Sequence, residues 1–203
     1  MSEGAIALDG ARLHVVQDEE RDTITWKAIW ICEKWSEDAC DFVRAKLGLD
    51  KMGVTSEQLR TLVGEAEETE ERPGNLLLQE GINEIWNLCT GVAAGSTYSN
   101  ANARIGVGDS STAEAANQTG LQASTNKLFK AMNATYPNLS GTGNVTCNWQ
   151  SDFLTAEANY AWNEWSIDNG STRDKNLNRK VPAGGLGTKS SGTWTLTASV
   201  TLS

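Results

Sequence analysis

Hydrophobic and polar residues alternate most regularly at the C-terminal end of the chain, in the segment TWTLTASVTLS. Trp194, Leu196 and Val200 fall on one side of this pattern, and threonine or serine occupies the alternate positions, such as Thr195 and Thr197. A period of two residues predicts a β-strand with one apolar face, and β-branched threonine suits the other face. We therefore expect a strand over residues 193–202, in an antiparallel sheet with one side facing solvent.

Three other segments alternate in the same way, but with apolar residues on both sides. TITWKAIWICEKW places Trp26 and Trp30 on one face and Ile29 and Ile31 on the other, which indicates a covered strand. GNVTCNWQSDF and AEANYAWNEWSI follow the pattern less strictly. The turn signals between strands are Ser140-Gly141, Asn169-Gly170, Gly184-Gly185 and Ser191-Gly192. Regular strands joined by tight turns predict a mainly β fold, an antiparallel β-sandwich with a few short helices.

Two of these helices are predicted in the acidic N-terminal part of the chain. In SEDACDFVRAKLGL, Ser36 precedes acidic residues, which is typical of a helix N-terminus. The positions near one face of this helix are Ala39, Phe42, Val43 and Leu47. In TSEQLRTLVGEAEETEER, the apolar positions Leu59, Leu62 and Val63 precede an acidic run. We interpret that run as an exposed helix end or loop, and an acidic metal cage is the alternative.

A third helix is predicted from the segment NLLLQEGINEIWNLCTG. Its apolar stripe consists of Leu78, Ile82, Ile85, Trp86 and Cys89. Gly91 supplies a stop signal. Together, these patterns predict one β-sandwich domain over residues 1–203, with an N-terminal arm at residues 1–20 and an acidic helical insertion at residues 36–72.

Length and charge narrow the range of partners. The chain has 203 residues, which is enough for one sizeable core, and its formal net charge is −9, of which residues 1–72 carry −8. An acidic surface repels phosphate backbones, so we expect no nucleic-acid partner. The nearest basic cluster, interrupted by Asp174, is Arg173, Lys175, Arg179 and Lys180. Neither a signal peptide nor a membrane span is apparent, so we expect no membrane partner and synthesis in a cytoplasm.

Residues that could carry catalysis are few. His14 is the only histidine, so a Ser-His-Asp triad would have to use it, yet no local motif ties a nucleophile to it. Glu157, Glu164 and Asp168 could supply the carboxylate pair of a glycosidase, but we interpret them as solvent-facing strand residues. We therefore expect no enzymatic activity and no catalytic residue.

Cysteine and tryptophan are both interpreted as core residues. The cysteines, which form no C-x-x-C pair and predict no zinc site, are Cys32, Cys40, Cys89 and Cys147. The tryptophans that fall in the C-terminal strand-like segments are Trp149, Trp162, Trp165 and Trp194. Core packing accounts for most of these tryptophans, and an exposed aromatic platform that stacks on sugars is the alternative.

Two glycines in ARIGVGDSSTAEAANQTGLQAS raise the question of a phosphate-binding loop. Gly106 and Gly108 follow a strand-like segment, but Ser111 stands where the dinucleotide-binding fingerprint requires a third glycine. No Gly-Lys-Ser or Gly-Lys-Thr occurs in the chain either. We interpret the segment as a structural turn, and we expect no bound nucleotide, metal or other cofactor.

An ordered series of segments resembles small β-rich virion proteins of tailed bacteriophages. In chain order the segments are GNLLLQEGINEIWNLCTG, NANARIGVGDSSTAEAANQTGLQ, AMNATYPNLSG, ANYAWNEWSIDNG, LNRKV and LGTKSSGTWTLTASVTLS. They cover residues 74–203, whereas residues 36–72 lie outside the pattern and look like an insertion.

The resemblance implies a structural role in the virion, of the capsid decoration or cement type. The protein would bind the outer surface of the capsid as a homo-oligomer, with the major capsid protein and copies of itself as partners. It would stabilise the head because it binds only the assembled lattice. A protein of the tail, baseplate or fibre is the second interpretation, and a carbohydrate-binding module is the third.

Overall fold

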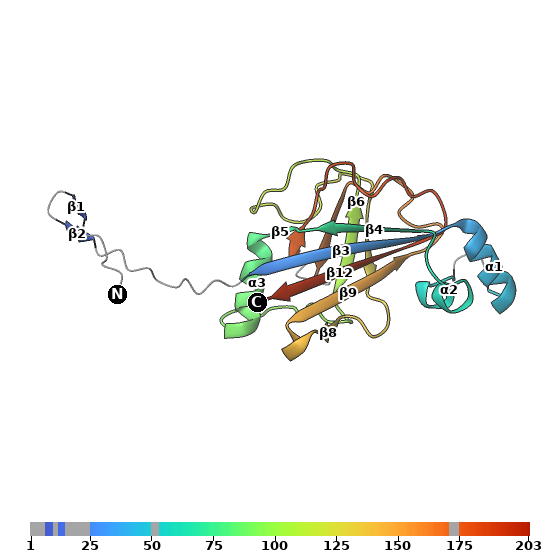
Figure 1. Ribbon diagram of the computed structural model, residues 1–203, viewed down its shortest axis with the longest axis horizontal. Coiled ribbons are helices and arrows are strands. Elements are labelled where there is room, and N and C mark those ends of the chain that lie inside the picture. The colour runs from blue at the N-terminus through green and yellow to red at the C-terminus, as the bar shows by residue number, and fades with distance from the viewer. Residues whose placement is uncertain (1–6, 10–11, 15–24, 50–52, 171–174) are drawn as a thin grey trace.

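The structure is a computed structural model that describes residues 7–9, 12–14, 25–49, 53–170 and 175–203. Its larger sheet is fully antiparallel, with the strand order β4-β3-β12-β9-β8. The bounds of these strands are Glu68–Pro73, Trp26–Trp35, Thr193–Leu202, Thr146–Phe153 and Asn138–Ser140. The long strands β3, β12 and β9 form its centre (Figure 1).

A smaller sheet forms the second layer. It has the order β10-β6-β7, with bounds Glu164–Asp168, Arg104–Gly108 and Lys127–Ala131. A β-bridge between Trp165 and Lys180 joins it to the pair formed by β11 (Asn178–Arg179) and β5 (Leu76–Leu77). In Figure 1 the strand β6 runs steeply across the strands of the larger sheet. The predicted mainly β, sandwich-like fold with antiparallel sheets is confirmed.

The two layers enclose a core rich in tryptophan. Trp30 of β3 meets Trp165 of β10 edge to face, with ring centroids 6.2 Å apart. Trp162 packs in the same manner against Phe153 at 4.7 Å and Trp194 at 5.0 Å. Edge-to-face pairs add to the stabilisation that burial of the rings provides. The core-packing interpretation is confirmed, because the four C-terminal tryptophans are all buried.

Strand β12 confirms the predicted alternation but not the prediction of one solvent-facing side. Leu196 and Val200 are buried against the core. On the other face, Thr197 and Ser199 form a polar ladder with β9, in which Gln150 donates to Thr197 at 2.9 Å. At the start of the strand, Thr195 is buried as well. The helical insertion covers that end, which the strand pattern alone does not reveal.

The insertion begins with two helices, α1 (Glu37–Leu47) and α2 (Ser56–Leu62). Ser36 caps α1 as predicted, since its hydroxyl accepts a hydrogen bond from the Ala39 N–H. A second apolar cluster lies between these helices and the sheet: Trp35, Ala39, Cys40, Val43, Val54 and Leu59. The predicted face of α1 is partly wrong, because Phe42 and Leu47 are exposed.

The acidic run is a loop over residues 64–67, as expected, but a strand in its second part. Residues 68–73 form β4, the edge strand that pairs with β3. Lys34 of β3 donates hydrogen bonds to Glu68 and Glu70. Charged side chains on an edge strand discourage pairing with another chain. Within the described ranges, no group of three or more His, Cys, Asp or Glu side chains is placed to hold a metal ion.

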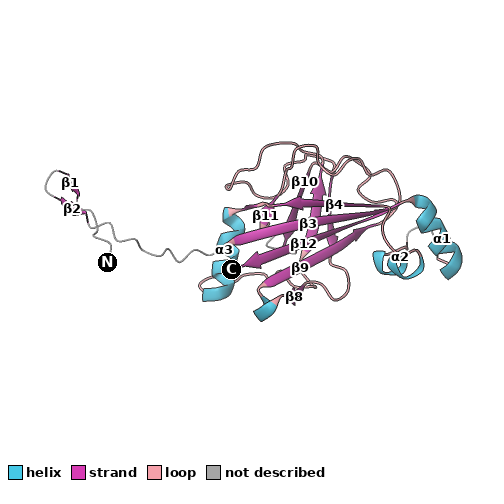
Figure 2. Ribbon diagram, viewed as in Figure 1, coloured by secondary structure: helices cyan, strands magenta, loops and turns pink. Residues whose placement is uncertain are grey.

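Helix α3 (Gln79–Thr90) ends at Gly91, which adopts the left-handed conformation as predicted. Its predicted apolar stripe is partly wrong: Leu78 is buried and Ile85 packs against the core, but Trp86 is 61 % exposed, and the buried positions within the helix are Gly81 and Glu84. Helix α3 lies at one end of the larger sheet and α1 and α2 at the other (Figure 2). None of the described helices is long and apolar enough to span a membrane.

The glycine segment is a strand interior rather than a turn. Gly106 and Gly108 belong to β6, the central strand of the smaller sheet. A Cβ atom at Gly106 would lie 2.4 Å from the Phe129 ring, and one at Gly108 would lie 2.6 Å from the Glu164 carboxylate. These glycines are therefore needed for close packing and not for a tight turn.

Three short elements complete the fold. A 3-10 helix (Thr142–Asn144) connects β8 to β9. Strands β1 (Ala7–Asp9) and β2 (Arg12–His14) pair with each other in a two-stranded sheet. The rest of the predicted arm at residues 1–20 lies outside the described residues.

Candidate functional site

Two of the three carboxylates considered for catalysis are sealed inside the protein. Glu164 and Asp168 are both fully buried on β10, so their interpretation as solvent-facing residues is wrong. Glu157 lies elsewhere, half-buried in a turn, where it pairs with Lys130 at 2.6 Å. The structure does not combine the three carboxylates into one accessible pair.

Glu164 is the centre of a buried ion pair with Arg179. The two side chains are 0 % exposed, and the Arg179 Nε donates to the Glu164 carboxylate at 2.7 Å. The backbone N–H groups of Gln122 and Ala123 donate to the same carboxylate, at 2.9 and 2.7 Å. Every oxygen of this buried charge is thus satisfied, as stability of a buried pair requires.

The same arginine fixes the long loop over residues 109–126. Its guanidinium donates to the carbonyl oxygens of Thr112 and Ala113 and to the side chain of Gln118, at 2.9, 3.4 and 2.8 Å. The pair therefore joins β10, β11 and the loop into one rigid unit. The proposed basic cluster does not form around Arg179, because its charge is buried and neutralised.

A buried lysine was not identified from the sequence. Lys189 is 1 % exposed, and its amine donates to the Leu154 carbonyl at 2.9 Å and to the Asn159 side chain at 3.0 Å. Burial lowers the pKa of Lys189 to about 8. Lysines with lowered pKa values serve as nucleophiles in some enzymes. Because a substrate has no access to this amine, Lys189 acts as a structural link to the 154–159 turn.

Histidine and cysteine form no catalytic arrangement in the described residues. His14 lies in β2, whose side chains are outside the description. All four cysteines are free thiols, with Cys32 and Cys40 buried as expected. Burial raises the pKa of Cys32 well above its usual value, so this thiol stays protonated. The interpretation as a buried hydrophobe is wrong for Cys89, which is exposed on α3.

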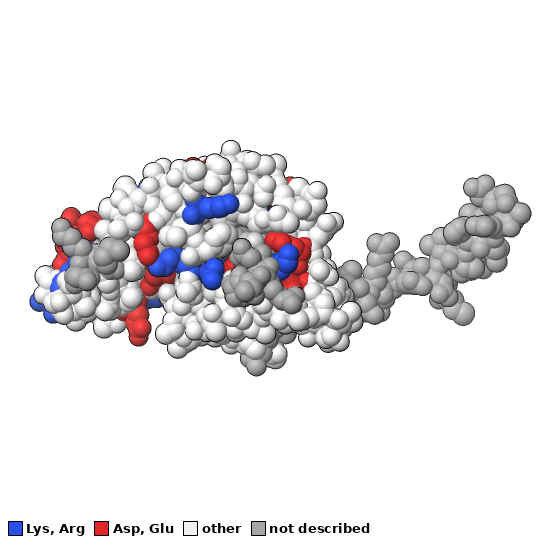
Figure 3. All heavy atoms as spheres, turned by 180° about the vertical axis from the view of Figure 1, so that it is seen from behind, with Lys and Arg blue, Asp and Glu red and all other residues white. Residues whose placement is uncertain are grey.

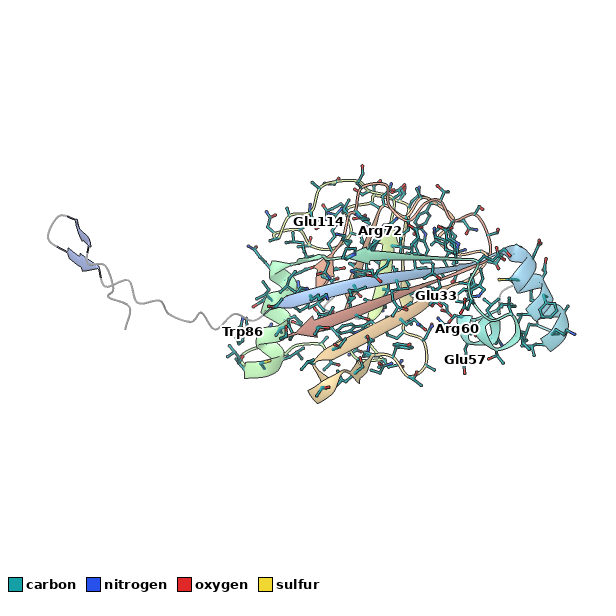
Figure 4. The ribbon with its side chains drawn as sticks, viewed as in Figure 1. Glu33, Glu57, Arg60, Arg72, Trp86 and Glu114 are labelled. Carbon is teal, nitrogen blue, oxygen red and sulfur yellow. The ribbon has the colours of Figure 1, made fainter. Side chains whose placement is uncertain are left out.

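One end of the larger sheet, here called the open end, has apolar side chains that no described element covers. It surrounds a cavity of about 300 Å³ between α3 and the larger sheet. The residues of the open end with exposed side chains are Leu139, Val145 and Leu202, beside Trp26 and Ile85 of the cavity lining. Trp86 follows Ile85 on α3 at this end of the molecule (Figure 4). Contiguous exposed apolar surface is typical of a contact region.

Charged residues are dispersed over the face of the molecule that points away from the viewer in Figure 1. In Figure 3 most of the visible surface is uncharged, and Lys, Arg, Asp and Glu occur in separate groups of both signs. A nucleic-acid interface would place Lys and Arg along a continuous stripe. The face in Figure 3 has no such stripe among the described residues.

Comparisons with known proteins identify no relative. No family model matches the chain, and no curated protein or solved structure is significantly similar to it.

The sequence contained one signal that could have identified the buried ion pair. Ile105 and Val107 alternate with Gly106 and Gly108, which is the pattern of a strand that lies against a bulky neighbour. A glycine in a central strand leaves room for one large side chain, and here that side chain is Glu164. The partner Arg179 is distant in sequence and carries no local signal.

Proposed function

We propose that the protein is a virion structural component of a tailed bacteriophage, of the capsid decoration or cement type. In this role it binds the outer surface of the head and bridges neighbouring subunits of the major capsid protein. Its mechanism is thermodynamic linkage: a ligand that binds only the assembled shell makes disassembly less favourable. No chemical step is required of its side chains.

One observation carries the proposal: separate segments of the resemblance meet in one buried network. Gly108 comes from the GVGDSS segment, Glu164 from NEW and Arg179 from LNRKV. Glu164 fills the space above Gly108, and Arg179 neutralises Glu164 while binding Thr112 of the first segment. Gly108, Glu164 and Arg179 thus maintain a rigid framework, and none of the three is accessible to a substrate. This supports a structural role.

The open end supports a role that depends on contact area. Leu139, Val145 and Leu202 are 59 %, 44 % and 48 % exposed, and the exposed Trp86 lies on α3 at the same end of the molecule (Figure 4). Tryptophan is among the residues most enriched in binding hot spots. A neighbouring subunit of the shell would bury this surface and gain hydrophobic stabilisation.

The test combines location with shell stability. Purified particles of the phage that encodes the chain are examined for the protein by immunogold labelling of heads and tails. Particles lacking it are then heated beside complete ones. We expect label on the heads and earlier shell disruption without the protein. Label only on tails, with unchanged head stability, would contradict the capsid assignment and support the tail interpretation.

A further inference from the structure

A polar cavity lies apart from the network of Glu164 and Arg179. It has a volume of about 520 Å³ and opens on the outer face of the larger sheet, where α2 approaches β9. The third wall is the loop over residues 133–136. Small-molecule sites commonly have volumes of about 300–1,000 Å³. Because α2 belongs to the insertion, the framework without the insertion would lack this cavity.

The floor of the cavity is fixed by Asp152. Its buried carboxylate accepts hydrogen bonds from the Ser56 N–H at 2.7 Å, the Asn133 side chain at 2.9 Å and the Thr195 hydroxyl at 2.8 Å. These contacts connect α2, the loop and β12. The Asn133 N–H also donates to the Gln150 carbonyl at 2.8 Å. The walls are therefore held in place before any ligand binds, which lowers the cost of binding.

The loop wall is held in a strained shape. Thr135 has φ of 72°, a left-handed conformation that is unfavourable for a β-branched residue. The side chain of Asn100 donates to the carbonyl oxygens of Asn133 and Tyr136 on either side of it. Such a conformation persists only where the surrounding structure fixes it, and it is common at binding sites. Here it directs the half-buried Tyr136 to the cavity.

The other side chains that line the cavity offer both hydrogen-bond donors and acceptors, and the charges of Glu57 and Arg60 are opposite. Glu57 is exposed, and no described residue donates a hydrogen bond to its carboxylate. Arg60 is held by Glu33 and donates to the Ser56 hydroxyl at 3.3 Å. Figure 4 shows Glu33, Arg60 and Glu57 in a row where α2 meets the sheet. The acids repel phosphate, and Arg60 repels a metal ion.

We propose that this cavity binds a neutral sugar unit of a glycan. Hydroxyl groups of a sugar both donate and accept hydrogen bonds, which matches the Glu57 carboxylate and the hydroxyls of Thr55, Ser56 and Tyr136. The Tyr136 ring supplies an apolar surface with a polar tip for the C–H face of the sugar. The site uses no tryptophan, so it differs from the aromatic platform considered from the sequence. It does not depend on the virion assignment.

The test uses the full chain and neutral methyl glycosides of glucose, galactose, mannose, N-acetylglucosamine, N-acetylgalactosamine and rhamnose. Saturation-transfer NMR detects binding, and titration gives its strength. We expect at least one sugar to bind. Glu57→Gln should weaken that binding about tenfold, the effect of losing one hydrogen bond to a charged group. Tyr136→Ala should weaken it at least as much.

A matched control distinguishes the loss of a contact in the cavity from the loss of a negative charge elsewhere on the surface. Glu65 is an exposed glutamate of the same insertion that does not line the cavity. Glu65→Gln should leave sugar binding unchanged. The proposal is overturned if no sugar binds, if binding survives both cavity substitutions, or if inorganic phosphate binds in place of the sugars. None of these results would alter the location of the protein in the virion, so the two proposals fail separately.

Discussion

The two ends of the larger sheet are completed in different ways. At the end where β3 finishes, α1 and α2 cover the outer face, and Trp35, Val54 and Leu59 are buried beneath them. At the open end, where β12 finishes, Leu139 and Leu202 remain about half exposed beside an apolar cavity. Among the described residues, the chain thus supplies its own cover at the first end, whereas no described element covers the apolar side chains of the second.

The largest effect is expected from Arg179→Met, in the framework that lies between the two ends. This substitution leaves the Glu164 charge buried without its partner, which typically costs about 3–5 kcal/mol of the free energy of unfolding. Urea unfolding followed by tryptophan fluorescence measures the loss. Lys180→Met, at the adjacent half-buried lysine, is the control. An equal, small effect of both would show that the ion pair does not stabilise the framework.

The end of the larger sheet that α1 and α2 cover, called the covered end, should lose stability when its apolar cluster loses a side chain. Leu59 is 0 % exposed, so Leu59→Ala creates a cavity under α2 and should lower the free energy of unfolding by about 2–5 kcal/mol. Leu62→Ala, on the same helix but 38 % exposed, should cost much less. Urea unfolding of both variants checks this difference. Similar losses would mean that the insertion does not pack as described.

A substitution at the open end should weaken the association of the protein with particles and should change its free energy of unfolding little. Trp86→Ala removes a ring that is 61 % exposed, so the free energy of unfolding should change by less than about 1 kcal/mol. Its incorporation into particles should fall, measured as copies per particle when the variant replaces the wild type. Phe42→Ala on α1, another exposed aromatic residue, should not reduce incorporation. The reverse pattern would assign the contact to the insertion.

A smaller effect is expected at acidic pH, where the covered end should lose the stabilisation that Glu37 provides. Burial raises the pKa of Glu37, but hydrogen bonds from the Gly192 N–H, at 2.8 Å, and from Arg44 outweigh it and lower the pKa below 4.5. The stabilisation from Glu37 is therefore complete above pH 4.5 and is lost as the pH falls through the lowered pKa. The stability difference between wild type and Glu37→Gln should be constant from neutral pH down to that point and should shrink below it. Urea midpoints over a pH series test this. A difference that grows in acid would contradict the sign.

The sequence predicted the strands better than their surroundings. The alternation from Thr193 to Leu202 is a local property of the chain, and it correctly predicted β12. The burial of Thr195 depends on α2 and Asp152, which are distant in sequence. The exposure of Trp86 was missed for a related reason. Helical spacing shows which residues share a stripe, but it does not show whether another element covers that stripe.

The same limit applies to the sites. Glu164 resembled an exposed strand residue because its partners, Gly108 and Arg179, are separated from it in the chain. The polar cavity gave no sequence signal, since its walls come from α2, β9 and the loop at residues 133–136. Only the fold brings these segments together. A single motif could therefore have identified neither feature.

Amide hydrogen exchange of the protein, free and bound to purified particles, shows whether the open end is the contact surface. We expect slower exchange on binding in residues 79–90 and 138–146, around the open end, and little change in α1 and α2. Exchange that stays the same at the open end, or that slows only over the insertion, would contradict the claim that the uncovered apolar end is the contact surface.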